Sequence, residues 1–394
     1  MEQGIIQNLR KAFEDQFGSV DDTRVFFAPG RVNLIGEHTD YNGGHVFPCA
    51  LSFGTYMMAR KRGDRTIKGF SLNFESVGVL EASMDPLVYD PADNWLNYPK
   101  GVAKMFQGAG YTVDSGWEMV LFGNIPNGSG LSSSASVELV AAIMLEAFFN
   151  LDMDRVEMVQ LCQKAENDFN GVNCGIMDQF AIGMGKENHA VLLDCNTLVY
   201  EYAPIELDHA AIVIGNTKVR RELVDSAYNN RRSACERALA QLQAELEIGA
   251  LGELTEAVFE AHAHLITDPV DCQRAKHAVA ENQRTLQAVE ALKNKDIKAF
   301  GLLMNASHVS LRVDYEVTGK ELDTMVELAW DHPGVLGSRM TGAGFGGCTV
   351  SIVEKDQVEA FIEHVGKAYT EAIGWEPEFY VAQVGDGAKE LKGV

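Results

Sequence analysis

The sequence predicts a mixed α+β protein built of two lobes that divide near residue 205. Short alternating or apolar runs occur in both halves of the chain and are separated by long helical patterns. A new strand pattern, Ala210–Ile214, follows Pro204. The length of 394 residues also exceeds that of a typical single core. We therefore divide the chain into residues 1–205 and 206–394.

The first half is predicted to begin with a helix, because Glu2, Glu14 and Asp15 interrupt the apolar residues of Met1–Phe17. This pattern is typical of an amphipathic helix and not of a signal peptide. Strands are expected at Arg24–Ala28, Thr55–Arg60, Trp117–Phe122 and Ala190–Leu193. Helices are expected at about Ser133–Asn150, opened by a serine cap, and at about Asp154–Phe169.

The second half shows the same mixture of elements. A strand is expected at Ala210–Ile214, and helices at about Asp225–Leu246 and Val270–Leu292. Two further strands are expected near Cys348–Val353 and Glu378–Val381. The alternation of the two element types supports the α+β class for both lobes.

Composition excludes several classes of protein. The 56 acidic and 33 basic residues give a net charge of −23, which disfavours a nucleic-acid partner. The longest apolar stretch, Val137–Leu151, contains Glu138 and Glu146 and is too short to span a bilayer, so no membrane partner is expected. Seven widely spread cysteines favour a reducing cytoplasm. Any anionic ligand must be held locally, by backbone N–H groups, a few cationic side chains and a divalent cation.

The first of three glycine-rich segments is residues 29–44, which follows a predicted strand. It contains Arg31, Glu37, His38 and Asp40, which supply donors and acceptors for a polyhydroxylated ligand. A capped turn with solvated charges explains the same composition. A metal site is a further alternative, although one histidine and two carboxylates here lack a defined ligand spacing.

The second segment, residues 123–136, leads directly into the helix predicted from Ser133. Its glycines let the backbone approach a ligand closely, and a helix start presents unpaired N–H groups to an anion. The segment therefore suits a phosphate group, although no lysine follows the serines as in a Walker A loop. A serine-rich helix cap is the alternative.

The third segment, residues 337–348, contains a G-x-G-x-x-G pattern at Gly342, Gly344 and Gly347. A dinucleotide-binding motif requires a helix after the last glycine, whereas a strand pattern follows here. The segment is therefore a glycine loop that either packs against a flat or anionic group or makes a tight turn.

Taken in this order, the three segments resemble the GHMP small-molecule kinases, and the first is similar to the galactokinase signature. Pro126–Ala135 matches the phosphate loop of the superfamily, P-x-x-x-G-L-S-S-S-A, and Gly30–Tyr41 looks like the signature itself. Cys174–Gln179 and Ser226–Arg232 match as well. The resemblance extends from about residue 24 to residue 350.

The resemblance implies a ribosomal-S5-like N-terminal lobe and a ferredoxin-like C-terminal lobe, with ATP and sugar meeting in the cleft between them. The implied reaction transfers the γ-phosphoryl group of ATP to the 1-hydroxyl of α-D-galactose. An N-acetylgalactosamine kinase and a non-catalytic regulator that binds galactose and ATP remain alternatives, although intact Asp178 and Arg31 favour catalysis. A monomer is favoured over an oligomer.

The resemblance also implies roles for individual residues. Asp178 would be the base and Arg31 the stabilising cation. The sugar would contact Glu37, His38, Thr39, Asp40, Gly175 and Tyr228. The phosphates of ATP would contact Gly128, Ser129, Gly130, Leu131, Ser132, Ser133 and Ser134. Mg²⁺ would bind Ser134 and Glu166, and Ser71 and Trp95 would lie near the adenine, where a packing role is equally open. An arginine beside a carboxylate weakens it as a base, so Asp178 could instead mainly orient the hydroxyl.

Overall fold

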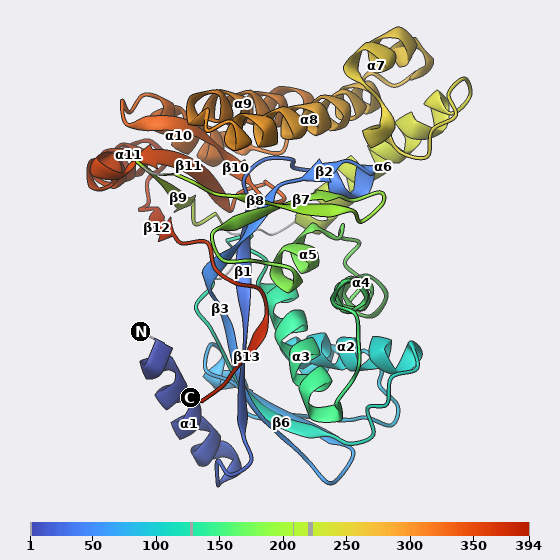
Figure 1. Cartoon of the computed structure of the whole chain (residues 1–394), viewed down its shortest axis with the longest axis vertical. Helices are drawn as coiled ribbons and strands as arrows, with labels where there is room; N and C mark the ends of the chain where they lie inside the picture. The colour runs from blue at the N-terminus through green and yellow to red at the C-terminus, as the bar shows by residue number, and fades with distance from the viewer. Residues whose placement is uncertain (1, 127–128, 208, 220–223, 394) are drawn as a thin grey trace.

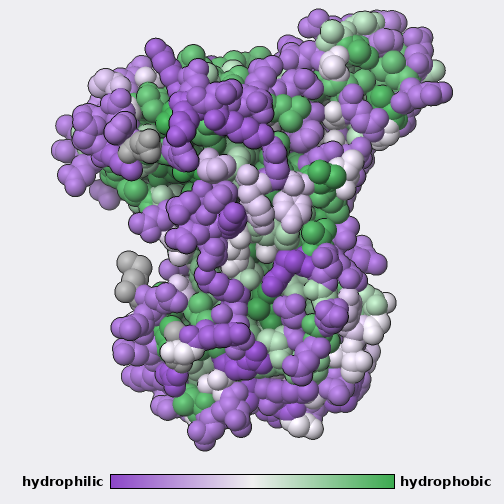
Figure 2. All heavy atoms as spheres, viewed as in Figure 1, coloured by the Kyte–Doolittle hydropathy of each residue, from purple (hydrophilic) through white to green (hydrophobic). Residues whose placement is uncertain are grey.

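The computed structural model describes residues 2–126, 129–207, 209–219 and 224–393. Within these residues the strands form three sheets, and Figure 1 shows them distributed over two lobes. Hydrophilic side chains cover most of the face that Figure 2 shows, and the molecule narrows between the lobes. No helix in the described ranges is long and apolar enough to cross a membrane.

The lower lobe in Figure 1 is organised around a six-stranded sheet with the order β13-β1-β3-β6-β4-β5. The strands are β1 Arg24–Asn33, β3 Pro48–Lys61, β4 Thr66–Ser71, β5 Leu80–Ser83, β6 Trp117–Gly123 and β13 Lys389–Leu391. Neighbours are antiparallel, except that β4 and β6 are parallel. The sheet is the scaffold of this lobe because helices cover both of its faces.

One face of this sheet packs against α1 (Glu2–Phe17), where Leu9 and Phe13 contact the outward residues of β1 and β3. The other face carries the larger core, formed with α2 Asn97–Gly108, α3 Ser133–Phe149, α4 Arg155–Lys164 and α5 Met177–Gly183. Successive residues of β1 alternate between the two cores, with Val25 in the first and Phe26 in the second. This alternation is what a strand covered on both faces requires.

A bulge interrupts the pairing of β1 with β3 between Pro29 and Arg31. Bulges bend a strand and redirect the side chains that follow. Here β1 and β3 approach each other closely, which requires glycine at position 54 of β3. A Cβ atom at Gly54 would lie 2.0 Å from the carbonyl oxygen of Ala28. The bulge thus precedes Arg31, the first cationic residue of the candidate site.

The upper lobe contains a four-stranded antiparallel sheet with the order β10-β11-β9-β12. Its strands are β9 Ala210–Asn216, β10 Val335–Thr341, β11 Cys348–Glu354 and β12 Glu378–Ala382. Between β9 and β10 lie α6 Val224–Leu242, α7 Glu256–His262, α8 Pro269–Lys293, α9 Ile297–Ser310 and α10 Gly319–Trp330, and α11 Val358–Ile373 precedes β12. The chain order and the strand order together give the ferredoxin-like arrangement that the resemblance implies.

A third sheet, with the order β2-β7-β8, lies between the lobes in Figure 1. Its strands are β2 His45–Val46, β7 His189–Asp194 and β8 Tyr200–Pro204. After β12 of the upper lobe, the chain returns to the lower lobe, where β13 pairs with β1. Arg24 of β1 donates two hydrogen bonds to the carboxylate of Glu390, at 2.7 and 2.8 Å. The division near residue 205 stays a prediction. The strand β13 lies after that position in the sequence but belongs to the sheet of the lower lobe.

Each strand and helix predicted from the sequence is present, with three differences in detail. The helix expected to run to about Leu246 ends at Leu242. The helix expected to run to Phe169 ends at Lys164 and continues as a π-helical turn over Ala165–Phe169. The expected serine cap of α3 is wrong. Ser132 stands at the cap position with φ 64°, but its hydroxyl makes no capping hydrogen bond and donates to Asp178 instead.

We expect Gly54→Ala to lower the free energy of unfolding by about 1–3 kcal/mol, because the new methyl group meets backbone atoms that cannot rotate away. Urea denaturation measures the change. The control is Gly63→Ala in an exposed turn, where nothing lies within 4 Å of the added atom. Equal stability of the two variants would contradict the tight packing at the bulge.

Candidate functional site

Two cavities are neighbours in the structure, since Asn170 lines one and Gly171 lines the other. The polar cavity, of about 200 Å³, is lined mainly by charged and hydrogen-bonding residues, among them Arg31, Glu37, His38, Asp40, Glu166, Gly175, Asp178, Tyr228 and Gly342. The aromatic cavity, of about 470 Å³, is lined among others by Ser71, Phe74, Tyr89, Trp95, Tyr98, Ser133 and Ser134. Ser134 of the aromatic cavity lies close enough to Glu166 of the polar cavity to lower the pKa of that carboxyl group.

An ion pair between Arg31 and Asp178 forms part of the lining of the polar cavity. Arg31 Nε donates to Asp178 Oδ1 at 2.8 Å, and its Nη1 donates to the carbonyl oxygen of Gly130 at 2.7 Å. Ser132 Oγ donates to the other carboxylate oxygen of Asp178 at 2.5 Å. The Arg31 side chain is buried, whereas that of Asp178 is 29% exposed. The contacts hold the carboxylate in one orientation, with part of it open to the polar cavity.

The loop after β1 supplies two further carboxylates to the polar cavity. Glu37 Oε1 accepts hydrogen bonds from Arg339 Nη1 at 3.2 Å and from the N–H of Gly342 at 2.8 Å. Asp40 lies directly against Gly175, where a Cβ atom would be 1.8 Å from Asp40 Oδ2. Burial, together with the charge of Asp178, raises the pKa of Asp40 to about 6. Both carboxylates are therefore fixed acceptors in a small enclosed space.

His38 lines the polar cavity, but both of its ring nitrogens have partners within the protein. Nε2 lies 3.2 Å from the carbonyl oxygen of Ala343 and must donate to it, so Nδ1 accepts from the hydroxyl of Tyr41 at 2.7 Å. Burial, with the neighbouring charge of His277, lowers the pKa of His38 to about 3, which keeps the ring neutral. His38 therefore offers a ligand the ring itself and not a free nitrogen.

Thr39 does not line the polar cavity. Its hydroxyl is buried and donates to the carbonyl oxygens of Gly36 and His45, at 2.9 and 2.7 Å. The hydroxyl of Thr39 therefore stabilises the conformation of its own loop. The structure does not favour a direct contact between this hydroxyl and a ligand. Tyr228 of α6 does line the cavity, with its ring centroid 5.6 Å from that of His38.

The phosphate-loop residues predicted from the sequence face in several directions, and Gly128 lies outside the described residues. Gly130 and Leu131 direct carbonyl oxygens toward the side chain and the N–H of Arg31. Ser133 and Ser134 line the aromatic cavity at the start of α3, where helix N–H groups are unpaired. The hydroxyl of Ser129 is buried and has no partner in the described part of the chain. The loop thus combines polar groups turned inward with others turned toward the aromatic cavity.

Ser71 and Trp95 line the same cavity as these serines, which supports their expected place near a nucleotide base. Aromatic residues around them were not identified from the sequence, namely Phe74, Tyr89 and Tyr98. These three residues belong to no motif. The only signal in the sequence is that several aromatic residues occur close together, which could have indicated a flat apolar ligand. The aromatic cavity suits such a ligand because stacking needs large, flat surfaces.

A buried acidic group lies behind Asp178. Gln179 Nε2 donates to Glu166 Oε2 at 2.5 Å and to Glu138 Oε2 at 3.1 Å. Burial, with the charge of Asp178, raises the pKa of Glu166 to about 7, although hydrogen bonds from Ser134 and Gln179 oppose this rise. Burial likewise raises the pKa of Glu138 well above its usual value. No cluster of three or more histidine, cysteine or acidic residues that could hold a metal occurs within the described ranges.

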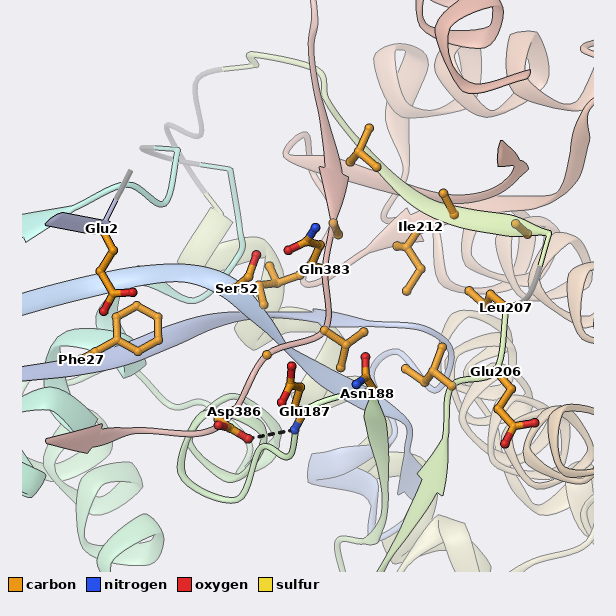
Figure 3. A pocket seen from close by; sticks show the side chains of 18 of the residues that line it. Glu2, Phe27, Ser52, Glu187, Asn188, Glu206, Leu207, Ile212, Gln383 and Asp386 are labelled. Atoms are coloured by element: carbon orange, nitrogen blue, oxygen red, sulfur yellow. Dashed lines mark hydrogen bonds between the residues drawn. The ribbon is translucent and has the colours of Figure 1, made fainter. Parts of the chain in front are cut away.

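A larger cavity, of about 1070 Å³, contains none of the predicted site residues. Figure 3 shows it between α1, β3, β9 and the segment that leads to β13. The N–H of Glu187 donates to Asp386 at 3.0 Å across one side of it. Its lining mixes acidic, basic, amide, aromatic and aliphatic side chains. The candidate site is therefore the pair of smaller cavities.

Comparison with known proteins agrees with this geometry. Residues 11–61 match the galactokinase galactose-binding signature, residues 97–186 the GHMP kinases N terminal domain, and residues 288–371 the GHMP kinases C terminal model. A galactokinase from Fusobacterium nucleatum is 58% identical, with 98% of this chain and 100% of that relative covered. The chain belongs to the galactokinase family. A Clostridium beijerinckii galactokinase is 57% identical over 98% of this chain and 99% of its own length.

Solved structures of the galactokinase family and the wider superfamily share the fold. Lactococcus lactis galactokinase complexed with galactose superposes with a TM-score of 0.97 at 49% identity, covering 98% of this chain and 100% of that one. Methanococcus jannaschii mevalonate kinase gives 0.66 at 16% identity, over 93% and 99% of the two chains, which shows a common fold alone. The predicted family, two-lobed fold and ATP-dependent sugar kinase activity are confirmed. The assigned site residues stay predictions.

We expect Glu138→Gln to stabilise this galactokinase-family chain at pH 8 and to have little effect at pH 5. The folded protein holds the proton of Glu138 more tightly than the unfolded chain does, so stability falls as the pH rises above about 4.5. Glutamine carries no such penalty, which is worth about 1.4 kcal/mol for each unit of raised pKa. Urea denaturation at both pH values measures the difference, with exposed Glu260→Gln as the control. A difference independent of pH would contradict the neutral state of Glu138.

Proposed function

We propose that the chain transfers the γ-phosphoryl group of ATP to the 1-hydroxyl of α-D-galactose, which gives galactose 1-phosphate and ADP. The observation that carries the proposal is the Arg31–Asp178 pair, which lines a polar cavity that has an aromatic cavity as its neighbour. A sugar fits the first cavity by its hydrogen-bonding groups, and a nucleotide fits the second by its aromatic walls. The relative solved with galactose supports the choice of sugar.

In the polar cavity, Glu37 and Asp40 accept hydrogen bonds from sugar hydroxyls remote from the reacting one. The contact between Asp40 and Gly175 fixes one of these acceptors, because any larger residue at 175 would displace the carboxylate. Tyr228 closes the cavity from α6. ATP lies in the aromatic cavity with its phosphates at the first turn of α3, where the helix dipole favours anions.

Chemistry in this arrangement consists of positioning and charge neutralisation. Asp178 accepts a hydrogen bond from the 1-hydroxyl and receives its proton as the new O–P bond forms and the bond to ADP breaks. Because both carboxylate oxygens already accept hydrogen bonds, from Arg31 and Ser132, the group is oriented more than it is basic. The guanidinium of Arg31 offsets the negative charge on the transferred group.

The residues present fit Mg²⁺. Ser134 and Glu166 place a hydroxyl and a carboxylate oxygen together at the junction of the two cavities, and Mg²⁺ prefers one or two such ligands besides water and substrate phosphates. When bound there, the ion would neutralise charge on the phosphates of ATP. The seven cysteines, all free in the described part of the chain, support the proposed cytoplasmic location. That the chain acts as a monomer stays a prediction.

The test is a coupled assay of ADP release from the wild-type chain with ATP and Mg²⁺ and a panel of hexoses. We expect ADP release to depend on galactose and to exceed that with N-acetylgalactosamine. Faster turnover with N-acetylgalactosamine would reassign the substrate. Binding of galactose and ATP without ADP release would replace the enzyme with a regulator.

Sugar binding and chemistry are expected to fail separately in two variants. Asp178→Asn keeps the size of the side chain but should lower turnover by on the order of 10² or more. Asp40→Ala should chiefly weaken galactose binding, by about 1–3 kcal/mol, because it removes an acceptor from the sugar. Calorimetry with galactose and the turnover assay measure the two effects. Near-normal turnover of Asp178→Asn, or unchanged affinity of Asp40→Ala, would exclude the respective role.

Glu166→Gln is expected to raise the Mg²⁺ concentration needed for half-maximal turnover and to leave galactose affinity nearly unchanged. The reason is that an amide oxygen is a weaker ligand than a carboxylate for a hard cation. Titration of activity with Mg²⁺ at saturating ATP measures the shift. Glu157→Gln on α4 is the matched control, and an Mg²⁺ requirement equal to that of wild type would remove Glu166 from the proposed metal site.

A further inference from the structure

Helix α8 of the upper lobe presents a row of buried polar side chains to the sugar loop, here residues 36–45. We call this row, made of His277, Glu281, Asn282 and Thr285, the polar face of α8. Spacings of three and four residues place these side chains on one side of a helix. The row contacts β2 and the loop before it, and Figure 1 shows α8 passing above β2. A helix that belongs to one lobe thus reaches a loop that begins in the other.

The polar face of α8 holds the sugar loop by its backbone. Glu281 Oε1 accepts the N–H groups of Gly36 at 3.1 Å and of Glu37 at 3.3 Å. His277 Nε2 donates to the carbonyl oxygen of Glu37 at 3.1 Å. Asn282 Oδ1 accepts the N–H of His45 at 2.8 Å. Both polar atoms of the Glu37 backbone are therefore bound by neighbouring turns of one helix.

A second route from Glu281 reaches the side chain of Glu37. Ser307 Oγ donates to Glu281 Oε1 at 2.6 Å and accepts from Arg339 Nε at 3.1 Å. Arg339 Nη1 then lies 3.2 Å from Glu37 Oε1. Backbone and side-chain contacts close a ring of four residues, all of them at most 1% exposed. Such a ring leaves the Glu37 carboxylate a single placement in the polar cavity.

The ring is charged as well as buried. Glu281 Oε2 pairs with Arg284, one turn further along α8. Burial opposes ionisation of Glu281, but Arg284, His277, Arg339 and the Ser307 hydroxyl outweigh it and lower its pKa to about 2. The N–H and O–H groups around Glu281 form stronger hydrogen bonds to a carboxylate than they would form to an amide. Loss of its charge would weaken both routes to Glu37 together.

We propose that Glu281 is a positioning residue for the sugar substrate: it holds Glu37 in its binding geometry through the loop backbone and through Ser307 and Arg339. Glu281 does not line the polar cavity and touches no substrate. The inference rests on the proposed function, because Glu37 is assigned there as an acceptor for a galactose hydroxyl. A purely structural Glu281 would affect stability alone, whereas a positioning residue affects galactose binding selectively.

The experiment compares the KM values for galactose and ATP with kcat in Glu281→Gln and in two companions. Glu281→Gln should raise the galactose KM by about tenfold or more, with kcat within about threefold and the ATP KM unchanged. Ser307→Ala, which cuts only the route through Arg339, should raise the galactose KM by a smaller factor and still fold. Val289→Ala is the control, since Val289 is buried on α8 in the apolar core and has no part in the ring.

Thermal melting of all three variants separates stability from binding. The inference predicts that Val289→Ala loses stability with an unchanged galactose KM, while the two ring variants change that KM. A galactose KM within twofold of wild type in Glu281→Gln and Ser307→Ala would overturn the inference. So would equal rises in the KM values for galactose and ATP. Failure of the wild-type chain to release ADP with galactose would instead count against the proposed function itself.

Discussion

The guanidinium group of Arg31 is the contact on which the site depends. It donates to the Asp178 carboxylate and to the Gly130 carbonyl oxygen, while the backbone N–H of Arg31 donates to the carbonyl oxygen of Leu131. The strand that carries it, the helix that carries Asp178 and the glycine loop before α3 are thereby fixed relative to one another. A planar group with five donors can join three segments in this way, whereas a lysine at the same place could not. Arg31 thereby fixes the glycine loop against the lining of the polar cavity.

An acidic protein that binds phosphate groups must concentrate positive charge at its active site. The net charge is −23, and Asp40, Glu138 and Glu166 crowd around the site behind Asp178. Burial keeps part of this group neutral by raising pKa values, so the field at the reaction centre is less negative than the sequence suggests. Helix N–H groups, the arginine and a proposed divalent ion then supply the positive charge that phosphate chemistry needs.

Much of the architecture was predictable because apolar periodicity and three glycine-rich motifs were strong signals, and most site residues predicted by resemblance lie together. The failures have local causes. A serine was expected to cap α3, but the hydroxyl of Ser132, which stands at that position, donates to Asp178, 46 residues further along the chain. Thr39 stays a predicted sugar contact, although its hydroxyl bonds to carbonyl oxygens of its own loop. The ring through Glu281 and Arg339 was missed, since buried polar residues on a helix belong to no motif and become visible only when distant segments meet.

The return of β13 to the first sheet has a consequence for biosynthesis. The ribosome releases β1 long before its partner strand β13, and the Arg24–Glu390 contact closes a separation of 366 residues. A nascent chain that has only its first half outside the ribosome therefore carries an open edge along β1. Open edges invite pairing with other chains and engagement by chaperones. The first lobe to be translated thus completes its sheet only after the elements of the second lobe have been translated.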